Sequence, residues 1–261
     1  MSQHEQRVAL VSGATSGIGL AVARLLASQH HKVFIGARNA DNVAATVKQL
    51  QDEGLDVDGT TLDVRSAESV HAFVATAVDR FGTVDVLVNN AGRSGGGVTA
   101  DIDDELWNDV IDTNLNSVFR LTREVLTTGG LREKSRGRII NIASTAGKQG
   151  VVLGAPYSAS KHGVVGFTKA LGNELAPTGI TVNAVCPGYV ETPMAQRVRA
   201  GYAAAYDTSE DAILDKFQSK IPLGRYSTPE EVAGLVGYLA SDTAASITAQ
   251  ALNVCGGLGN F

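Results

Sequence analysis

The stretch APYSASKHG, residues 155 to 163, holds a tyrosine and a lysine four residues apart, Tyr157 and Lys161. If a helix runs from about Ser158 onward, positions four apart share one face, so the phenol and the ammonium converge. An ammonium beside a phenol, especially with a cationic cofactor next to it, lowers the phenol pKa from about 10 towards working pH. Such a phenol is a usable general acid. The alternative is that Tyr157 caps the helix and Lys161 is solvated.

A glycine-rich turn follows the first strand-like run. The sequence SGATSGIG carries Gly13, Gly17 and Gly19 where that strand passes into a helix. Glycine permits the turn and a close approach of the backbone to a phosphate, while the helix N-terminus offers free amides and a favourable dipole. The position of this turn predicts dinucleotide binding, although its glycine spacing is wider than GxGxxG.

The end of the second strand indicates which dinucleotide is bound. It reads GAR, so Arg38 stands where NAD-binding proteins usually offer a carboxylate to the ribose 2′-hydroxyl. A planar guanidinium suits a 2′-phosphate instead, which favours NADP over NAD. The rival is that Asp41 supplies the carboxylate, although it lies further past the strand. Asp63, at the end of the third strand, is a candidate acceptor for the adenine amino group or a cap for the next helix.

Short apolar runs alternate with longer helix-like stretches along the chain. The helical patterns cover residues 17–29, 40–53, 66–81 and 103–127 and the residues after Tyr157. The strand runs are VALVSG, KVFIGAR, DGTTLDV, VDVLVNNAG, GRIINIAS, ITVNAVCPG and ALNVCGG. These runs are nearly continuously apolar, which is typical of strands covered on both faces by crossover helices. We therefore predict an α/β fold, a Rossmann-like doubly wound parallel sheet of about seven strands with ligands beyond the strands' carboxyl ends. Residues 191–220 break the alternation and predict two short helices, a mobile lid at the mouth of a cleft.

Composition limits the other possibilities. A chain of 261 residues fits one domain, residues 1–261, and its formal net charge of −5 comes with no basic tail, which argues against nucleic acid. No apolar run approaches about 18 residues and the start is polar, so we expect neither a secretory signal nor a membrane span. Cys186 and Cys255 lie far apart without metal-like spacing. They predict buried thiols, a cytoplasmic location and no metal site.

Motifs in a fixed order carry a resemblance. The glycine loop, NNAG at 89–92, Asn114, Ser144, YSASK and PGYVETP at 187–193 occur in sequence, and together they resemble the short-chain dehydrogenase/reductase family. Longer blocks across the whole chain are similar to the type II (aromatic) polyketide ketoreductases. These blocks are VALVSGATSGIGLAVARLL, GTVDVLVNNAGRSGGG, GRIINIASTAGKQGVV, APYSASKHGVVGFTKALGNELAPTGITVNAVCPGYVETPM and TAQALNVCGGLGN.

The resemblance implies a catalytic set of Asn114, Ser144, Tyr157 and Lys161. Tyr157 would protonate the reduced carbonyl and Ser144 would hydrogen-bond the same oxygen, an arrangement worth about 3 kcal/mol per donor. Lys161 would hold the nicotinamide ribose and lower the Tyr157 pKa, and Asn114 would organise a water chain. All four residues are present, which argues against an inactive protein.

The resemblance also implies NADPH as cofactor. Thr192 would reach the carboxamide, or else serve only a turn, and the Asn89–Gly92 stretch would pack its backbone near the cofactor. The expected cofactor-binding residues are Gly13, Thr15, Ser16, Gly17, Ile18, Gly19, Arg38, Asp63, Val64, Asn90, Tyr157, Lys161, Pro187, Gly188, Val190 and Thr192.

The loop RSGGG, residues 93–97, follows the fourth strand and should open towards the cleft. The similar ketoreductases typically read proline-glycine-glycine here, and Ser94 replaces that proline, which leaves the loop freer and puts the stereochemical inference in doubt. Tyr202 is either part of the cleft or an exposed loop aromatic. The expected substrate residues are Arg93, Ser94, Gly95, Gly96, Thr145, Gln149, Val151, Met194 and Tyr202.

The activity implied by the resemblance is reduction of the C9 carbonyl, at the ninth carbon from the thioester end, of an aromatic polyketide precursor on an acyl carrier protein. The alternatives are a 3-oxoacyl-carrier-protein reductase of fatty acid synthesis and a non-catalytic NADP-binding scaffold. An acidic carrier protein requires local positive charge. Arg38, Arg65 and Arg93 follow three strand ends, and Arg197 and Arg199 are further candidates. Family resemblance also implies a homotetramer, with the last strand and the preceding helix between subunits.

Overall fold

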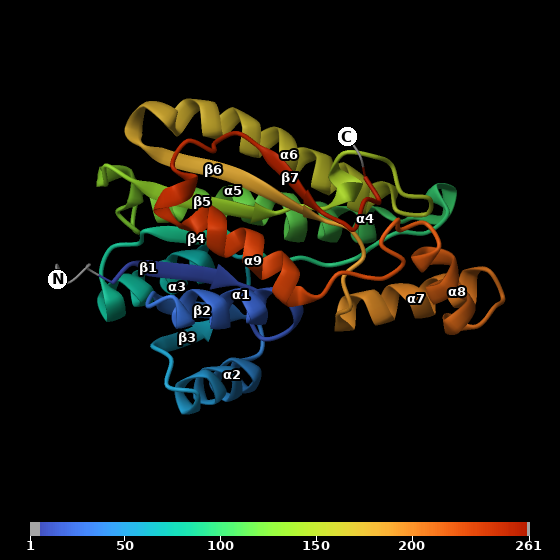
Figure 1. Ribbon diagram of the computed structural model, residues 1–261, viewed down its shortest axis with the longest axis horizontal. Coiled ribbons are helices and arrows are strands. Elements are labelled where there is room, and N and C mark those ends of the chain that lie inside the picture. Colours follow the sequence, from blue (N-terminus) through green and yellow to red (C-terminus); the bar gives the residue numbers. More distant parts are fainter. Residues whose placement is uncertain (1–5, 260–261) are drawn as a thin grey trace.

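The computed structural model describes residues 6–259, which fold around one parallel sheet with helices on both faces (Figure 1). The strand order is β3-β2-β1-β4-β5-β6-β7, and every pair is parallel. The strands are β1 Val8–Ser12, β2 Lys32–Ala37, β3 Val57–Thr61, β4 Val86–Asn89, β5 Gly137–Ile142, β6 Ile180–Pro187 and β7 Ala251–Val254. The predicted doubly wound sheet is confirmed. Its order reverses between β1 and β4, which is where such folds bind ligands.

Both faces of the sheet are buried. In β1, Ala9 and Val11 pack on one face, whereas Val8 and Leu10 pack on the other, because successive side chains of a strand alternate. One face is covered by α1 Gly17–Ser28, α2 Ala40–Asp52 and α9 Pro229–Ala240. The opposite face is covered by α3 Ala67–Phe81, α5 Ser117–Leu126 and α6 Ala155–Leu175. This double burial explains why the strand sequences are continuously apolar.

The helical stretch predicted for residues 103–127 is confirmed, but it is not one uniform α-helix. The segment contains α4 Asp104–Ile111, a five-residue π-helix Asp112–Asn116, and then α5. A π-turn inserts a residue into an α-helical ladder, and such turns are frequent at functional sites. Nothing in the composition of DTNLN distinguishes it from an α-helical turn, so sequence reasoning missed the interruption.

Helix α6 begins three residues before the predicted start. It runs from Ala155, with Pro156 in the first turn, so Tyr157 is itself helical. Proline is well tolerated at the first helical positions, where its missing N–H is not needed. Tyr157 and Lys161 therefore lie one turn apart on the same helix, as their spacing predicts.

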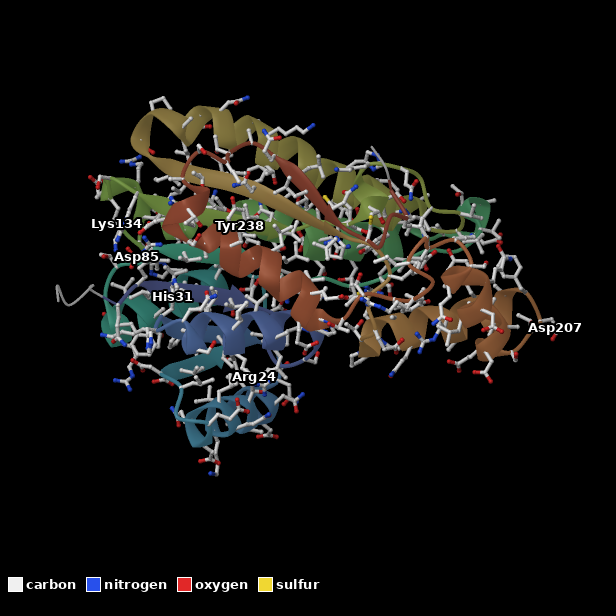
Figure 2. All side chains as sticks on the ribbon, viewed as in Figure 1. Arg24, His31, Asp85, Lys134, Asp207 and Tyr238 are labelled. Carbon is white, nitrogen blue, oxygen red and sulfur yellow. The ribbon has the colours of Figure 1, made fainter. Side chains whose placement is uncertain are left out.

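Two helices project beyond the carboxyl end of β6, α7 Pro193–Ala205 and α8 Glu210–Gln218 (Figure 1). They pack through a small separate core that includes Tyr189, Phe217 and Tyr226. Figure 2 labels Asp207, between these helices, at one end of the molecule, and Asp85 and Lys134, near the strands' amino ends, at the other. Helices α7 and α8 form the predicted helical insert and are called the lid below. Over residues 6–259, the structure holds no helix that is both long and apolar enough to span a membrane.

Candidate active site

The four predicted catalytic residues come from three neighbouring elements beyond the carboxyl ends of β4 and β5. Ser144 lies two residues after β5, Tyr157 and Lys161 lie in α6, and Asn114 lies in the π-helix. Three of them, Asn114, Ser144 and Lys161, are buried. The parallel sheet therefore brings together residues that are up to 47 positions apart in the sequence (114 to 161).

Ser144 and Tyr157 are joined by a side-chain hydrogen bond. The Ser144 oxygen also accepts a hydrogen bond from the Ala146 amide at 3.0 Å, as the cap of the short 3₁₀ helix Thr145–Gly147. That contact fixes the direction of the Ser144 side chain. The two hydroxyl groups consequently face one point, where a carbonyl oxygen would receive two hydrogen bonds.

Lys161 lies behind this pair. Its Nζ donates to the Ile142 carbonyl at 2.8 Å and is 5.8 Å from the centroid of the Tyr157 ring. Burial lowers the Lys161 pKa to about 8, because the charged form is disfavoured away from water. Above that pH the buried ammonium loses its proton.

The predicted effect of Lys161 on Tyr157 is not what the protein's own residues produce. Burial raises the pKa of Tyr157, and the hydrogen bond with Ser144 only opposes that rise. The expectation that the neighbouring ammonium lowers this pKa is therefore wrong for the protein alone, since removal from water is the largest effect. A phenol in this environment keeps its proton at neutral pH, as a proton donor requires.

Asn114 is fully buried and its amide is held by protein groups. The Asn114 Oδ1 accepts from the Arg93 backbone N–H at 2.8 Å, and Nδ2 donates to the Arg93 carbonyl at 3.0 Å. The same Nδ2 also lies 3.1 Å from Ser160 Oγ, which donates to the Tyr157 carbonyl at 2.7 Å. Sequence reasoning missed Ser160, because it appeared only as a small residue between the tyrosine and the lysine. The Asn114 side chain thus braces the loop Arg93–Gly97 against α6. The predicted role of Asn114 in a water chain stays a prediction.

The glycine loop forms a cradle that a side chain would fill. Gly13 and Gly17 have φ angles of +67° and +53°, which favour glycine. A Cβ on Gly19 would lie 2.3 Å from the Gly13 carbonyl oxygen. Asn90 Nδ2 fixes the loop by donating to the carbonyls of Ser12 at 3.0 Å and Gly13 at 2.9 Å. Ser16 makes no side-chain cap to α1, so the first amides of this helix are open to an anion.

Arg38 and Asp63 follow adjacent strands. Arg38 is exposed directly after β2 and makes no hydrogen bond or ion pair within residues 6–259, so its guanidinium is available to an anion. The Asp63 carboxylate accepts from the Arg65 backbone at 3.0 Å and from its guanidinium at 2.9 Å, and these contacts lower the Asp63 pKa. The alternative that Asp63 caps α3 is wrong, because Ser66 caps that helix. Val64, beside Asp63, is buried.

The residues after β6 approach the same cradle. Gly188 donates its N–H to the Val254 carbonyl at 3.0 Å, and Val190 forms an isolated bridge to Ser227. Thr192 caps α7, with Oγ1 accepting from Ala195 at 3.2 Å. Its methyl group would lie 3.1 Å from a Cβ on Gly17, so Thr192 also covers the glycine loop. The remaining predicted cofactor residues, Thr15, Ile18 and Pro187, lie on these same segments.

The predicted substrate residues lie on three segments: the loop after β4, the loop before α6, and α7. A Cβ on Gly95 would lie 2.3 Å from Val110 Cγ2, and one on Gly96 would lie 1.9 Å from the Leu153 carbonyl oxygen, so both positions require glycine. The Tyr202 hydroxyl donates to the Val152 carbonyl, so Tyr202 is a bonded helical residue rather than a free loop aromatic. The other members of the set are Arg93, Ser94, Thr145, Gln149, Val151 and Met194.

Most of the arginines predicted to offer positive charge to a carrier protein form ion pairs. Arg65 and Arg93 both pair with Asp109, which lies in α4, and Arg199 pairs with Glu191 at 2.8 Å. Arg65 also pairs with Asp63, so the positive charge of these arginines is largely offset. Arg38 and Arg197 are the candidates without an ion pair in the described chain, and the positive patch stays a prediction. Sequence reasoning had no means of placing Asp109 between two arginines that are 44 and 16 residues away.

No cluster of histidine, cysteine or carboxylate residues in the described chain is arranged to hold a metal ion. Both cysteines, Cys186 and Cys255, are buried free thiols, in agreement with the prediction.

Comparison with known proteins gives consistent matches. The family model described as short chain dehydrogenase matches residues 7–203. The chain is 81% identical over 261 residues to a monensin polyketide synthase ketoacyl reductase from Streptomyces virginiae, with 100% of both chains covered. A crystal structure of a substituted actinorhodin polyketide ketoreductase with NADPH is 59% identical, covers 100% of both chains and has a TM-score of 0.97. A 3-oxoacyl-[acyl-carrier-protein] reductase of Vibrio cholerae is 41% identical over 254 residues, 97% of this chain and 98% of that protein.

Proposed function

The chain belongs to the short-chain dehydrogenase family, and we propose that it is an NADPH-dependent polyketide ketoreductase. The observation that carries this proposal is the hydrogen-bonded pair of Ser144 and Tyr157, with Lys161 behind it and the glycine cradle beside it. The substrate is a polyketide precursor carried by an acyl carrier protein, and the reduced group is its C9 carbonyl, at the ninth carbon from the thioester end.

The residues present fit NADPH. The loop around Gly13, Gly17 and Gly19 excludes side chains where a diphosphate approaches the first turn of α1. Arg38 is an unpaired guanidinium suited to the 2′-phosphate. When bound, the cofactor supplies the hydride for the carbonyl carbon. Asp63, Val64, Asn90, Val190 and Thr192 would complete its site.

The chain's own residues handle the proton. Tyr157 Oη holds a proton that burial retains at neutral pH, and it gives this proton to the oxygen of the reduced carbonyl. Ser144 Oγ donates a hydrogen bond to the same oxygen, so charge that develops there meets two positioned donors. Because the pKa of Lys161 is about 8, its charged form outnumbers its neutral form by roughly ten to one at pH 7. The ammonium stabilises the Tyr157 phenolate that remains after the proton has been transferred.

The similarity to polyketide enzymes supports the substrate class. The chain is 81% identical to a polyketide synthase reductase and 41% identical to a reductase named for 3-oxoacyl groups. Gly95 and Gly96 let the loop Arg93–Gly97 pack closely against Val110 and the Leu153 carbonyl. The higher identity to the polyketide enzyme favours a polyketide over a short 3-oxoacyl chain as substrate.

The proposed assembly is a homotetramer in the cytoplasm. Strand β7 is the edge of the sheet and all four of its residues are partly exposed, so its outer edge offers unpaired backbone groups. Tyr238 on α9, labelled in Figure 2, is 45% exposed, and Phe119 on α5 is 48% exposed. Light scattering on the purified protein tests this, with a mass near four times 27.1 kDa expected and a monomer mass contradicting it.

The substrate class is tested by NADPH consumption with trans-1-decalone beside an acetoacetyl thioester, each repeated with NADH. Fast turnover of the bicyclic ketone with NADPH and not NADH supports the proposal. A preference for the thioester would contradict the proposal and indicate a reductase of fatty acid synthesis. Cofactor binding without turnover of either ketone supports a scaffold role.

A further inference from the structure

Three consecutive residues before α6 each bond to a different element. The Val151 N–H donates to Ser158 Oγ on α6 at 3.2 Å. The Val152 carbonyl accepts from Tyr202 on the lid, and the Leu153 carbonyl accepts from the Gly97 N–H at 2.9 Å. The segment Val151–Leu153 therefore contacts α6, the lid and the loop Arg93–Gly97.

Leu153 has an unusual backbone conformation. Its φ angle is +58°, in the left-handed region that a branched side chain rarely adopts. Such a conformation persists only where the surroundings determine it. Two hydrogen bonds supply that constraint, because they fix Val152 to the lid and Leu153 to the loop Arg93–Gly97.

The loop Arg93–Gly97 is shaped to receive the Leu153 carbonyl. A Cβ on Gly96 would lie only 1.9 Å from that oxygen, and 3.0 Å from its carbon. Any residue other than glycine at position 96 therefore displaces Leu153 or the loop. By contrast, nothing lies within 4 Å of a Cβ on Gly150, in the same region.

We propose that Val151–Leu153 is a positioning segment that couples the lid to the loop Arg93–Gly97 and so sets how a bulky ketone lies against Tyr157. Val151 and Val152 are 37% and 72% exposed, which offers an apolar edge suited to a carbocyclic ring. The same loop is braced by Asn114 through the backbone of Arg93. Movement of the lid is thereby transmitted to a loop that is bonded to the catalytic residues. The substrate part of this inference rests on the proposed function, whereas the coupling itself does not.

The coupling is tested by amide hydrogen exchange in Tyr202→Phe, which removes the bond to Val152 and keeps the aromatic ring. In the described chain, Tyr202 makes no hydrogen bond to the loop Arg93–Gly97, so a change confined to the surroundings of Tyr202 would not alter exchange of the Gly97 amide. We expect exchange of the Gly97 amide to be roughly five-fold faster, the effect of losing one hydrogen bond. The matched control is Tyr206→Phe, a lid phenol whose ring is 5.9 Å from that of Tyr202 and which should leave Gly97 unchanged. Unchanged exchange in Tyr202→Phe, or equal changes in both variants, overturns the proposal.

The same coupling is tested from the opposite side with Gly96→Ala, using Gly150→Ala as the control. We expect KM for trans-1-decalone to rise roughly ten-fold in Gly96→Ala and to stay within about two-fold of the wild type in Gly150→Ala, because only a Cβ at position 96 meets Leu153. Gly96→Ala and Tyr202→Phe should also be non-additive, since each acts through the same segment. Additive effects contradict the proposal. If the enzyme does not reduce decalone at all but Gly97 exchange still rises in Tyr202→Phe, the coupling stands and the proposed function fails.

Discussion

Asn114 donates a hydrogen bond from Nδ2 to Ser160 Oγ at 3.1 Å, and this bond joins the π-helix to the catalytic helix. Ser160 is fully buried, and its hydroxyl donates a hydrogen bond to the Tyr157 carbonyl at 2.7 Å. Its hydroxyl is therefore a link between two residues of the proposed catalytic set, neither of which is its neighbour in the chain.

Replacing Ser160 should disturb both partners. In Ser160→Ala, one buried N–H of Asn114 loses an acceptor, at a cost of about 1 to 3 kcal/mol. We expect kcat to fall roughly ten-fold with KM for NADPH unchanged, because the side chains of Asn114 and Tyr157 change orientation while the glycine cradle does not. Steady-state kinetics and thermal unfolding measure this. Wild-type kcat together with a lowered melting temperature would assign Ser160 a purely structural role.

Much of this arrangement could be predicted from the sequence. The four-residue spacing of Tyr157 and Lys161 and the glycine turn depend on local geometry, which the sequence carries directly. The π-helix at Asp112–Asn116 and the pairing of Asp109 with Arg65 and Arg93 depend on packing between distant segments. The raised pKa of Tyr157 could not be predicted either, because it depends mainly on burial, and the charges near Tyr157 in the sequence do not reveal how far the phenol is removed from water.

Arg38 should determine the choice of cofactor. In Arg38→Ala, KM for NADPH should rise roughly ten- to hundred-fold, the effect of losing a charge-assisted contact to the 2′-phosphate. KM for NADH should change little, because NADH carries no such phosphate. Arg132→Ala, which removes an exposed arginine near the opposite end of the sheet, is the control. Equal losses with both cofactors would contradict the assignment.

Gly19 and Gly166 form a matched pair of helical glycines. A Cβ on Gly19 would lie 2.3 Å from the Gly13 carbonyl oxygen, whereas nothing lies within 4 Å of one on Gly166. Gly19→Ala should abolish NADPH binding and destabilise the fold, and Gly166→Ala should stabilise it by about 0.5 to 1 kcal/mol through helix propensity. Cofactor titration and urea unfolding distinguish the two. Normal NADPH affinity in Gly19→Ala would argue against a tight cradle.

Lys161 makes stability depend on pH in a defined direction. Its folded-state pKa of about 8 lies below the ordinary value of 10.5, so between these values the unfolded chain binds more protons. Stability from this group therefore rises as pH increases from about 8 to 10.5, by about 3 kcal/mol at most. The gain should disappear in Lys161→Met and persist in Lys169→Met, an exposed lysine of the same helix. Parallel pH profiles for wild type and Lys161→Met would mean that the ammonium is not desolvated in the folded protein.

The most direct test of the central claim is turnover of trans-1-decalone by Tyr157→Phe, with NADPH binding measured on the same sample. We expect that NADPH still binds and that kcat falls at least about 100-fold, because the proton donor is gone while the cradle and Ser144 remain. A variant that keeps kcat within about ten-fold of the wild type would show that another group protonates the carbonyl and would contradict the assignment of Tyr157.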